Sequence, residues 1–369
     1  MPKSADRCRS VRAFPRAPLG LEQRLLSRAI RAGITCGDHL IIAFSAGRDS
    51  LALAAASRWL VQRIEVAVTL VHIDHRLRHS SSAEAQQAVE LASSLGLPIV
   101  VREILGGFRD RHPGVGLEEA ARRERYRLLF EVAHDFGAKV IATAHHQQDQ
   151  AETVLLHLLR GSGLHGAAGM AEWRHLDSVV TMSDISQKQS NILIWRPLLH
   201  EEPSQITTYI ERLGLHPIID PSNTDHQFRR NAVRHQALPL LEDLASGAVA
   251  ALARYADIAA EEDQFLDLLA RAALDAARDS VCALRVDRLL AEPRALQCRM
   301  IRLWIGEAAD GLAPSFNRLA AVLDLARHSA SGREIEIGEG WTVRRSAAML
   351  HLRGEQPTGK RTEEDADGR

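Results

Sequence analysis

The sequence predicts an α/β fold: a doubly wound, mostly parallel sheet, followed by a helical connector and a small α+β domain. The first observation is that continuous apolar strands alternate with amphipathic helices, which is typical of a parallel sheet covered on both faces. The second is that polar residues follow the strands, at the edge where such sheets bind ligands. The expected strands are 40–44, 66–73, 99–104 and 140–144, and the expected helices are 19–32, 50–62, 83–95 and 117–136.

The second half of the chain has a different character. Residues 175–191 are polar and aperiodic and predict a surface insertion, and residues 238–277 have the Leu/Ala-rich spacing of a helical connector. Helices near 294–307 and 314–326, and then a hairpin over 334–352, predict a second module. We therefore expect a disordered extension, a first domain, a connector, a second domain and a disordered tail, with bounds 1–18, 19–237, 238–280, 281–354 and 355–369.

Composition limits the class of protein. The chain has 369 residues, 46% of them hydrophobic and 25% charged, which is ordinary for a globular protein of two or three domains. No apolar run approaches the roughly 20 residues needed to cross a bilayer. The four cysteines are scattered without a C-x-x-C pair, so we expect reduced thiols and a cytoplasmic location. Because the net charge is -1, any contact with RNA must come from local arginine clusters.

The segment after the first strand predicts a phosphate-binding loop. Small residues let backbone N–H groups approach an anion, and the following helix adds its positive end. Two serine hydroxyls can donate to phosphate, and the aspartate can hold Mg²⁺ on the same phosphates. The loop consists of Ser45, Ala46, Gly47, Arg48, Asp49 and Ser50. It lacks the lysine of G-x-x-x-x-G-K-[ST] and the glycines of G-x-G-x-x-G. The simpler alternative is a serine-rich turn with Asp49 as a helix cap.

Polar residues also follow two other strands. Period-2 alternation places His72 and Asp74 on one side of the sheet edge, although a polar strand terminus alone could explain them. His145 and His146 follow the fourth strand, but adjacent side chains diverge and there is no H-x-x-x-H face. We therefore expect these imidazoles and Asp149 to line a nucleotide cleft, not a zinc site.

Arginines on helices offer further contacts to anions. Arg122 lies four residues after Glu118, which allows either a salt-bridged face or a guanidinium directed toward phosphate. Arg230 and Arg234 share a helix face by their i,i+4 spacing, as a solvated basic face or as a grip on an anion. The preceding segment, 220–225, reads as a capped turn.

Taken in order, these segments resemble the tRNA(Ile)-lysidine synthases of the PP-loop, or N-type ATP pyrophosphatase, superfamily. The likeness covers about 40–354 and includes S-G-G-x-D-S at 45–50, T-A-H-H-x-D-D-Q-A-E-T at 143–153 and D-x-S-N-x-D…R-N-x-x-R at 220–234. Two positions depart from the family pattern. Ala46 replaces a glycine, which is tolerable if its φ is negative. Gln148 replaces the first of two acids, so a role in binding a metal or an ammonium group can pass only to Asp149.

The resemblance implies an adenine nucleotide alpha hydrolase-like fold, with ATP bound in the first domain and tRNA in the second. It implies that ATP adenylates the 2-carbonyl oxygen of the first anticodon cytidine of a CAU isoleucine tRNA and releases pyrophosphate. L-lysine then displaces AMP, giving lysidine and changing the specificity from methionine to isoleucine. Two alternatives are a tRNA thiolase of the same fold and a non-catalytic nucleotide- or RNA-binding module.

The resemblance also implies roles for individual residues. The catalytic candidates are Asp49, Asp149 and His145, with Mg²⁺ on Asp49. ATP would contact 45–50, His72 and Asp74. Glu152 and Arg122 are expected at the lysine site or the cleft, and the proton acceptor is open among Asp149, Glu152 and His145. The residues expected to contact tRNA are Arg229, Arg230, Arg234, Arg344 and Arg345. A homodimer is left open, and no membrane partner is expected.

Overall fold

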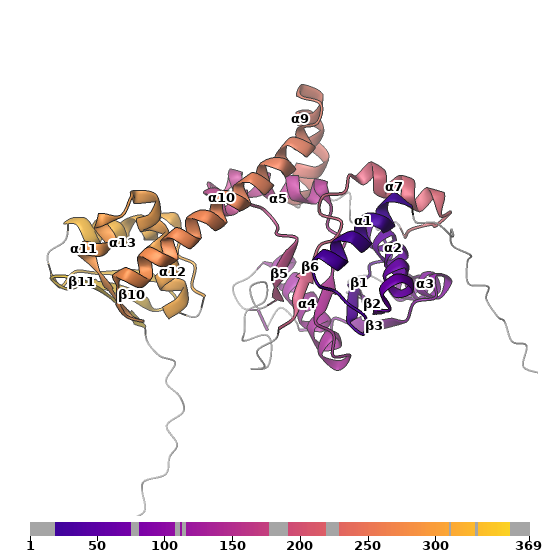
Figure 1. The fold of residues 1–369 in the computed structure, drawn as a ribbon, viewed down its shortest axis with the longest axis horizontal. Coiled ribbons are helices and arrows are strands. Elements are labelled where there is room, and N and C mark those ends of the chain that lie inside the picture. Colours follow the sequence, from indigo (N-terminus) through magenta and orange to yellow (C-terminus); the bar gives the residue numbers. More distant parts are fainter. Residues whose placement is uncertain are drawn as a thin grey trace, which may run out of the picture. The chain divides into compact units, whose positions relative to one another are not determined.

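The computed structural model divides the chain into two units, Met1–Ala260 and Glu261–Arg369, which Figure 1 colours from indigo through magenta and from orange to yellow. The described residues are 19–74, 81–107, 111–112, 116–176, 191–218, 229–309, 311–328 and 331–354. The expectations for 1–18, 220–225, 355–369 and most of 175–191 lie outside them. No helix in the described part is long and apolar enough to span a membrane.

The first unit contains a six-stranded sheet in the order β3-β2-β1-β4-β6-β5. Neighbouring strands are parallel except β5, which pairs antiparallel with β6. The strands are β1 His39–Ala43, β2 Ala67–Asp74, β3 Ile99–Glu103, β4 Val140–Ala142, β5 Trp173–His175 and β6 Leu193–Trp195. The chain moves outward from β1 through β2 to β3 and then returns to place β4 on the other side of β1. This reversal creates a switch point between β1 and β4, where sheets of this kind bind ligands.

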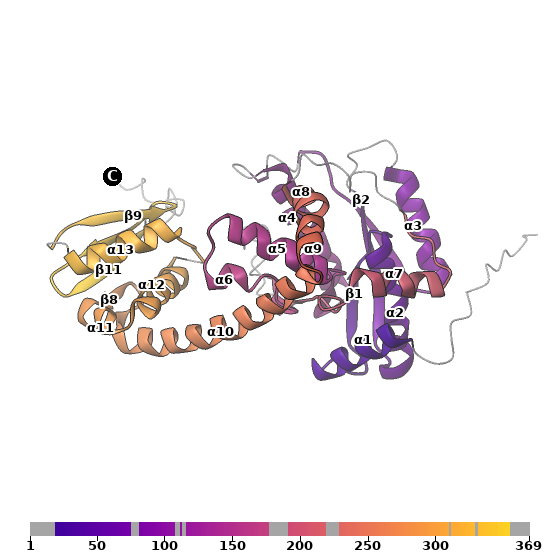
Figure 2. The same cartoon turned by 90° about the horizontal axis from the view of Figure 1, so that it is seen from above.

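Helices cover both faces of this sheet, as Figure 2 shows for α2 and α4. Leu40 and Ile42 face the core under α1, α2 and α7, whereas Ile41 faces the core under α4. This alternation follows from the period of two along a strand. The helices are α1 Gly20–Arg31, α2 Arg48–Ile64, α3 Ser81–Leu95, α4 Leu117–Asp135, α5 Gln147–Leu159, α6 Leu164–Ala167, α7 Pro203–Arg212, α8 Arg229–Ala232 and α9 Leu238–Leu244. A π-helical turn, Val233–Ala237, joins α8 to α9.

The second unit has its own core and its own antiparallel sheet, in the order β7-β8-β11-β10-β9. Trp304 and Ile301 of α12 pack with Val322 of α13 and Leu350 of β11 in that core. The long helix α10, Ala248–Ala277, spans the boundary of the two units. The other elements are β7 Arg278–Ser280, β8 Ala283–Arg285, α11 Val286–Ala291, α12 Arg294–Ala308, α13 Phe316–His328, β9 Glu334–Gly338, β10 Trp341–Arg345 and β11 Met349–Gly354.

The structure confirms the predicted fold class: a mostly parallel sheet first, then a helical region and a small antiparallel sheet. Two strands of the second unit, β7 and β8, were not predicted. Each has only three residues, too few for alternation to identify, and β8 exists by pairing with β11 some 65 residues later in the chain.

Candidate active site

The phosphate loop lies at the switch point, between the end of β1 and the start of α2. Gly47 precedes α2 with extended backbone angles, so the first N–H groups of the helix face the loop. The Oγ atoms of Ser45 and Ser50 lie 3.1 Å apart, and Ser50 also donates to the Gly47 carbonyl. The Ile218 N–H donates to the Ala46 carbonyl over 2.9 Å and ties the loop to the segment after α7. These bonds hold the loop in one conformation.

We expected alanine to be tolerable at position 46 if its φ is negative, and the structure shows a positive φ there. Its φ is +60°, in the left-handed region, and its side chain is fully buried. A residue with a Cβ costs about 1–2 kcal/mol there, which glycine would avoid. The alanine thus keeps the loop geometry of a glycine at the expense of local strain.

His72 supports the loop from the neighbouring strand. The imidazole is buried, and its Nδ1 lies 2.9 Å from the Phe44 carbonyl oxygen at the end of β1. Asp74, also buried, lies at the end of β2. Both predicted ATP-binding residues thus lie at the carboxyl edge of the strand beside the loop. The hydrogen bond of His72 is to Phe44, directly before the phosphate loop, and its contact with ATP stays a prediction.

An imidazole links the loop to the helix that follows β4. His146, which precedes α5, places Nε2 3.6 Å from Oδ2 of Asp49 and 3.5 Å from Oδ2 of Asp149. The His146 backbone N–H also donates to Asp149 over 3.0 Å. On the other side, Asp49 accepts from Nε of Arg48 over 2.8 Å. Two predicted catalytic acids from different strand ends thus converge on one histidine, which the sequence predicted in the cleft without a catalytic role.

Beside it, two acids of α5 meet two arginines from the α8 and π-helical segment. Arg230 donates through Nε to Glu152 over 2.9 Å and through a terminal nitrogen to Asp149 over 3.2 Å. Arg234 makes the same two contacts at 2.5 and 2.7 Å. Glu152 has no exposed surface. The i,i+3 acids and the i,i+4 arginines therefore form one interlocked cluster, in which the acids are buried and the arginines 35% and 28% exposed. The expected contact of these arginines with tRNA stays a prediction.

Electrostatics fix the charge states in this site. Burial alone would raise the pKa of Asp149, but the charges of His146, His145 and Arg230 hold it far below its ordinary value. Burial lowers the pKa of His145 to about 3; Asp149 opposes this, and the guanidinium of Arg196 adds to it. His145 is therefore neutral at physiological pH, with its Nδ1 2.9 Å from the Thr143 hydroxyl. The site contains an ionised carboxylate and an uncharged imidazole side by side.

The remaining predicted residues lie elsewhere. Arg122 lies on α4, with its guanidinium 5.2 Å from the centre of the Tyr126 ring. Arg229 is exposed at the start of α8. Arg344 and Arg345 lie on β10 of the second unit, where Arg345 donates to the Ala326 carbonyl near the end of α13. That hydrogen bond joins β10 to α13 within the second unit.

Glu201 supports the site, although sequence reasoning missed it. Its backbone carbonyl accepts from the N–H of Gln147, the first residue of α5. Its carboxylate is almost fully buried and binds Arg24 and Arg28 of α1. No local pattern marks this residue, because its side-chain partners lie more than 170 residues earlier in the chain.

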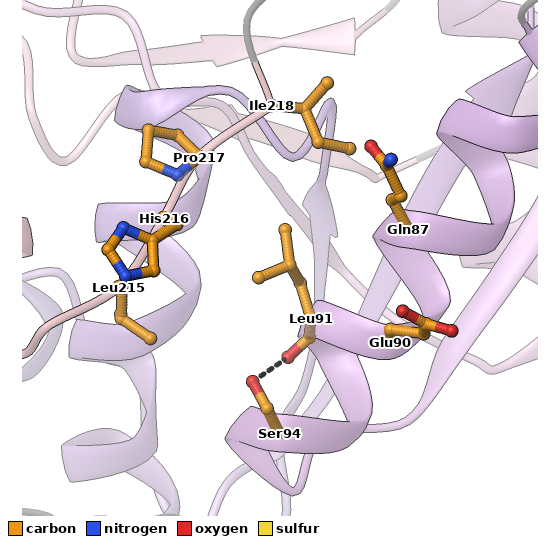
Figure 3. A pocket seen from close by; sticks show the side chains of 8 residues that line it. All are labelled: Gln87, Glu90, Leu91, Ser94, Leu215, His216, Pro217 and Ile218. Carbon is orange, nitrogen blue, oxygen red and sulfur yellow. Dashed lines mark hydrogen bonds between the residues drawn. The ribbon is translucent and has the colours of Figure 1, made fainter.

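A separate cavity of about 560 Å³ lies between α3 and the segment after α7 (Figure 3). Leu91 and Ile218 point into it, and Gln87 and Glu90 line its α3 side. None of the described residues that line it is an arginine, so this lining differs in chemistry from the site of acids and arginines at the sheet edge.

The fold and the loop define a nucleotide-binding α/β protein of the PP-loop class. Residues 23–241 match the family described as PP-loop domain, and 284–351 match the TilS substrate binding domain. The chain is 33% identical over 346 residues to the tRNA(Ile)-lysidine synthase of Symbiobacterium thermophilum, covering 90% of this chain and 68% of that relative. It is 39% identical over 288 residues to the enzyme of the same name from Salinispora tropica, covering 77% and 81%. The chain belongs to the tRNA(Ile)-lysidine synthase family.

Solved structures agree on the fold alone. The U34-tRNA thiolase NcsA from Methanococcus maripaludis superposes with a TM-score of 0.52 at 14% identity, over 65% of this chain and 78% of that one. The predicted family and enzyme class are thus confirmed: this is a PP-loop enzyme that uses ATP, and the reaction of its family is lysidine formation in tRNA.

Proposed function

We propose that the chain joins L-lysine to the 2-carbon of the first anticodon cytidine of a CAU isoleucine tRNA, through an adenylated cytidine. The observation that supports this proposal best is that the phosphate loop and the cluster of Asp149, Glu152, Arg230 and Arg234, the acid-arginine cluster, meet at one switch point, joined through His146. AMP and pyrophosphate are the other products. The family relationship favours this reaction over sulfur transfer or simple binding.

Adenylation requires stabilisation of the leaving pyrophosphate. The N–H groups at the start of α2 and the hydroxyls of Ser45 and Ser50 suit its oxygens. Arg230 and Arg234, held by Asp149 and Glu152, supply fixed positive charge beside the reacting phosphate. Because the acids position these arginines before the substrate arrives, little reorganisation is needed.

Asp49 fits a Mg²⁺ ion bound jointly with ATP. Among the described residues there is no group of three or more potential ligands that could hold a metal by itself. Mg²⁺ ordinarily uses one or two carboxylates together with phosphate oxygens and water, so a single partly exposed carboxylate next to the loop matches its chemistry. The ion would neutralise charge on the phosphates.

The second step needs a site for lysine and an acceptor for a proton. A carboxylate offers about four acceptor positions. The described hydrogen bonds of Asp149 use three of them, two from the arginines and one from the His146 N–H, and the His146 Nε2 lies 3.5 Å from Oδ2. An ammonium group at this acid would take the position that faces the His146 imidazole. The proton acceptor stays open among Asp149, Glu152 and His145, and the pKa of about 3 makes His145 the weak base that a general base at neutral pH should not be.

The experiment is incorporation of labelled lysine into a CAU isoleucine tRNA transcript by the purified protein. We expect incorporation that depends on ATP and is lost when the first anticodon cytidine is replaced by uridine. Incorporation into both transcripts would contradict the assigned target base, and none in either would contradict the reaction.

A further inference from the structure

Three arginines gather around Tyr126, away from the acid-arginine cluster. Arg174 of β5 lies opposite Ile194 of β6, and Arg196 follows two residues later, so alternation places both arginines on the face that carries Ile194. Ile194 packs in one core with Tyr126 of α4. Arg122, one turn earlier on α4, places its guanidinium over the Tyr126 ring. We call Arg122, Arg174 and Arg196 with Tyr126 the Tyr126 arginine cluster.

Arg196 is the buried end of this cluster. It is 3% exposed, donates to the Ala171 carbonyl over 2.7 Å and also hydrogen-bonds through its side chain with Tyr126. Its Nε is buried and, in the described part of the chain, has neither a hydrogen-bond partner nor a carboxylate in an ion pair. Leaving such a donor unsatisfied is unfavourable, and buried cations ordinarily have an anionic partner. The cluster therefore lacks one acceptor.

The charges around Arg196 agree with this geometry. Burial lowers the pKa of Arg196; Tyr126 opposes the shift, and the guanidiniums of Arg174 and Arg122 add to it. Burial, followed by the charge of Arg122, also lowers the pKa of Arg174. An arginine stays protonated in spite of such shifts, so positive charge accumulates here.

The cluster lies on the same sheet edge as the active site. The phosphate loop follows β1, His145 follows β4 and Arg196 follows β6, and these three strands are neighbours in that order. Since adjacent strands are roughly 5 Å apart, Arg196 lies about 10 Å along the edge from the loop. The charge of Arg196 also acts on His145, so the two sites share one electrostatic environment.

We propose that the Tyr126 arginine cluster binds a phosphodiester of the tRNA backbone next to the cytidine that is modified. This rests on the proposed function, because it presumes that the cytidine enters at the switch point. A planar guanidinium matches two phosphate oxygens, which suits the unused Nε of Arg196. Arg174 is exposed, Arg122 is half-buried and Arg196 is buried, so the cluster extends from solvent inward. A nucleic-acid strand entering from solvent fits that gradient better than a small enclosed amino acid.

The test is a double-mutant cycle on binding, measured without ATP or lysine. One change is Arg122→Gln, at a half-buried position where folding should be retained. The other is a single neutral methylphosphonate, placed on either side of the cytidine in an anticodon stem-loop. We expect each change alone to weaken binding roughly five- to tenfold, and the pair at one of the two phosphates to weaken it no further. Arg123→Gln, on the same helix, is the matched control and should add its effect independently.

Additive losses at both phosphates, or unchanged binding by Arg122→Gln, would overturn the proposal. The proposal would also be overturned if Arg122→Gln bound the stem-loop normally but had a raised KM for lysine. The cluster would then bind the carboxylate of the lysine substrate. Because the cycle measures binding only, a wild-type protein that binds the stem-loop but forms no lysidine would contradict the proposed function and not this site.

Discussion

Arg234 places Nε 2.5 Å from Oε1 of Glu152, a carboxylate with no exposed surface. Glu152→Gln leaves Arg230 and Arg234, which are 35% and 28% exposed, with Asp149 as their remaining described carboxylate, so the cost lies below that of breaking a fully buried pair. We predict that Glu152→Gln lowers the free energy of unfolding by about 2 kcal/mol, measured by urea denaturation. Glu119→Gln, which alters an exposed pair on α4, should cost less than about 1 kcal/mol. Equal costs would show that Glu152 is not buried with its partners.

Asp49 should be needed for chemistry and not for folding. Its side chain is 31% exposed, and its ion pair with Arg48 lies between adjacent residues. We predict that Asp49→Ala reduces tRNA-dependent pyrophosphate release by at least about a hundredfold, while thermal unfolding changes little. Asp135→Ala, at the exposed end of α4, is the control and should retain activity. A folded Asp49→Ala protein with normal release would remove Asp49 from the mechanism.

Ala46 offers a direct test of the loop backbone. In Ala46→Gly, relief of the left-handed strain and loss of a buried methyl group oppose each other, so stability should change by no more than about 1 kcal/mol. Ala46→Val adds a β-branched side chain at positive φ in a buried position and should cost more than about 2 kcal/mol. Calorimetry on both variants checks this. A well-tolerated valine would mean that φ is negative.

His145 should make the protein less stable in acid. Its pKa is about 3 when folded and about 6.5 when unfolded. Between these values the unfolded state binds the extra proton, so stability falls as pH decreases below 6.5. We predict that His145→Asn reduces this slope by up to one proton, about 1.4 kcal/mol per pH unit, in denaturation from pH 6.5 to 4. Parallel curves for variant and wild type would show that His145 titrates normally.

Local pattern was sufficient for the sheet of the first unit. Its inner strands are apolar runs such as Leu40–Ile42, so periodicity and the polar strand ends located both the fold and the edge that carries the site. Each half of the acid-arginine cluster could also be read from spacing, with Asp149 and Glu152 on one helix face and the two arginines on another.

The sequence did not predict that the acidic face of α5 contacts the arginine face of the α8 and π-helical segment. Arg230 and Asp149 are 81 residues apart, and only the packing of α5 against the π-helical segment brings them together. Their separate patterns are equally compatible with solvated faces, so spacing alone did not predict the ion pairs between them. The φ of Ala46 was hidden for a similar reason, since a non-glycine residue seldom adopts a positive φ and nothing local signals it.

The most direct test of the whole account is to incubate the protein with CAU isoleucine tRNA and ATP labelled in the α-phosphate, without lysine. We expect pyrophosphate release that requires tRNA, label transferred to the tRNA, and loss of that label as AMP when lysine is added. An enzyme that released pyrophosphate with lysine alone and never labelled the tRNA would contradict activation of the cytidine, and with it the central claim.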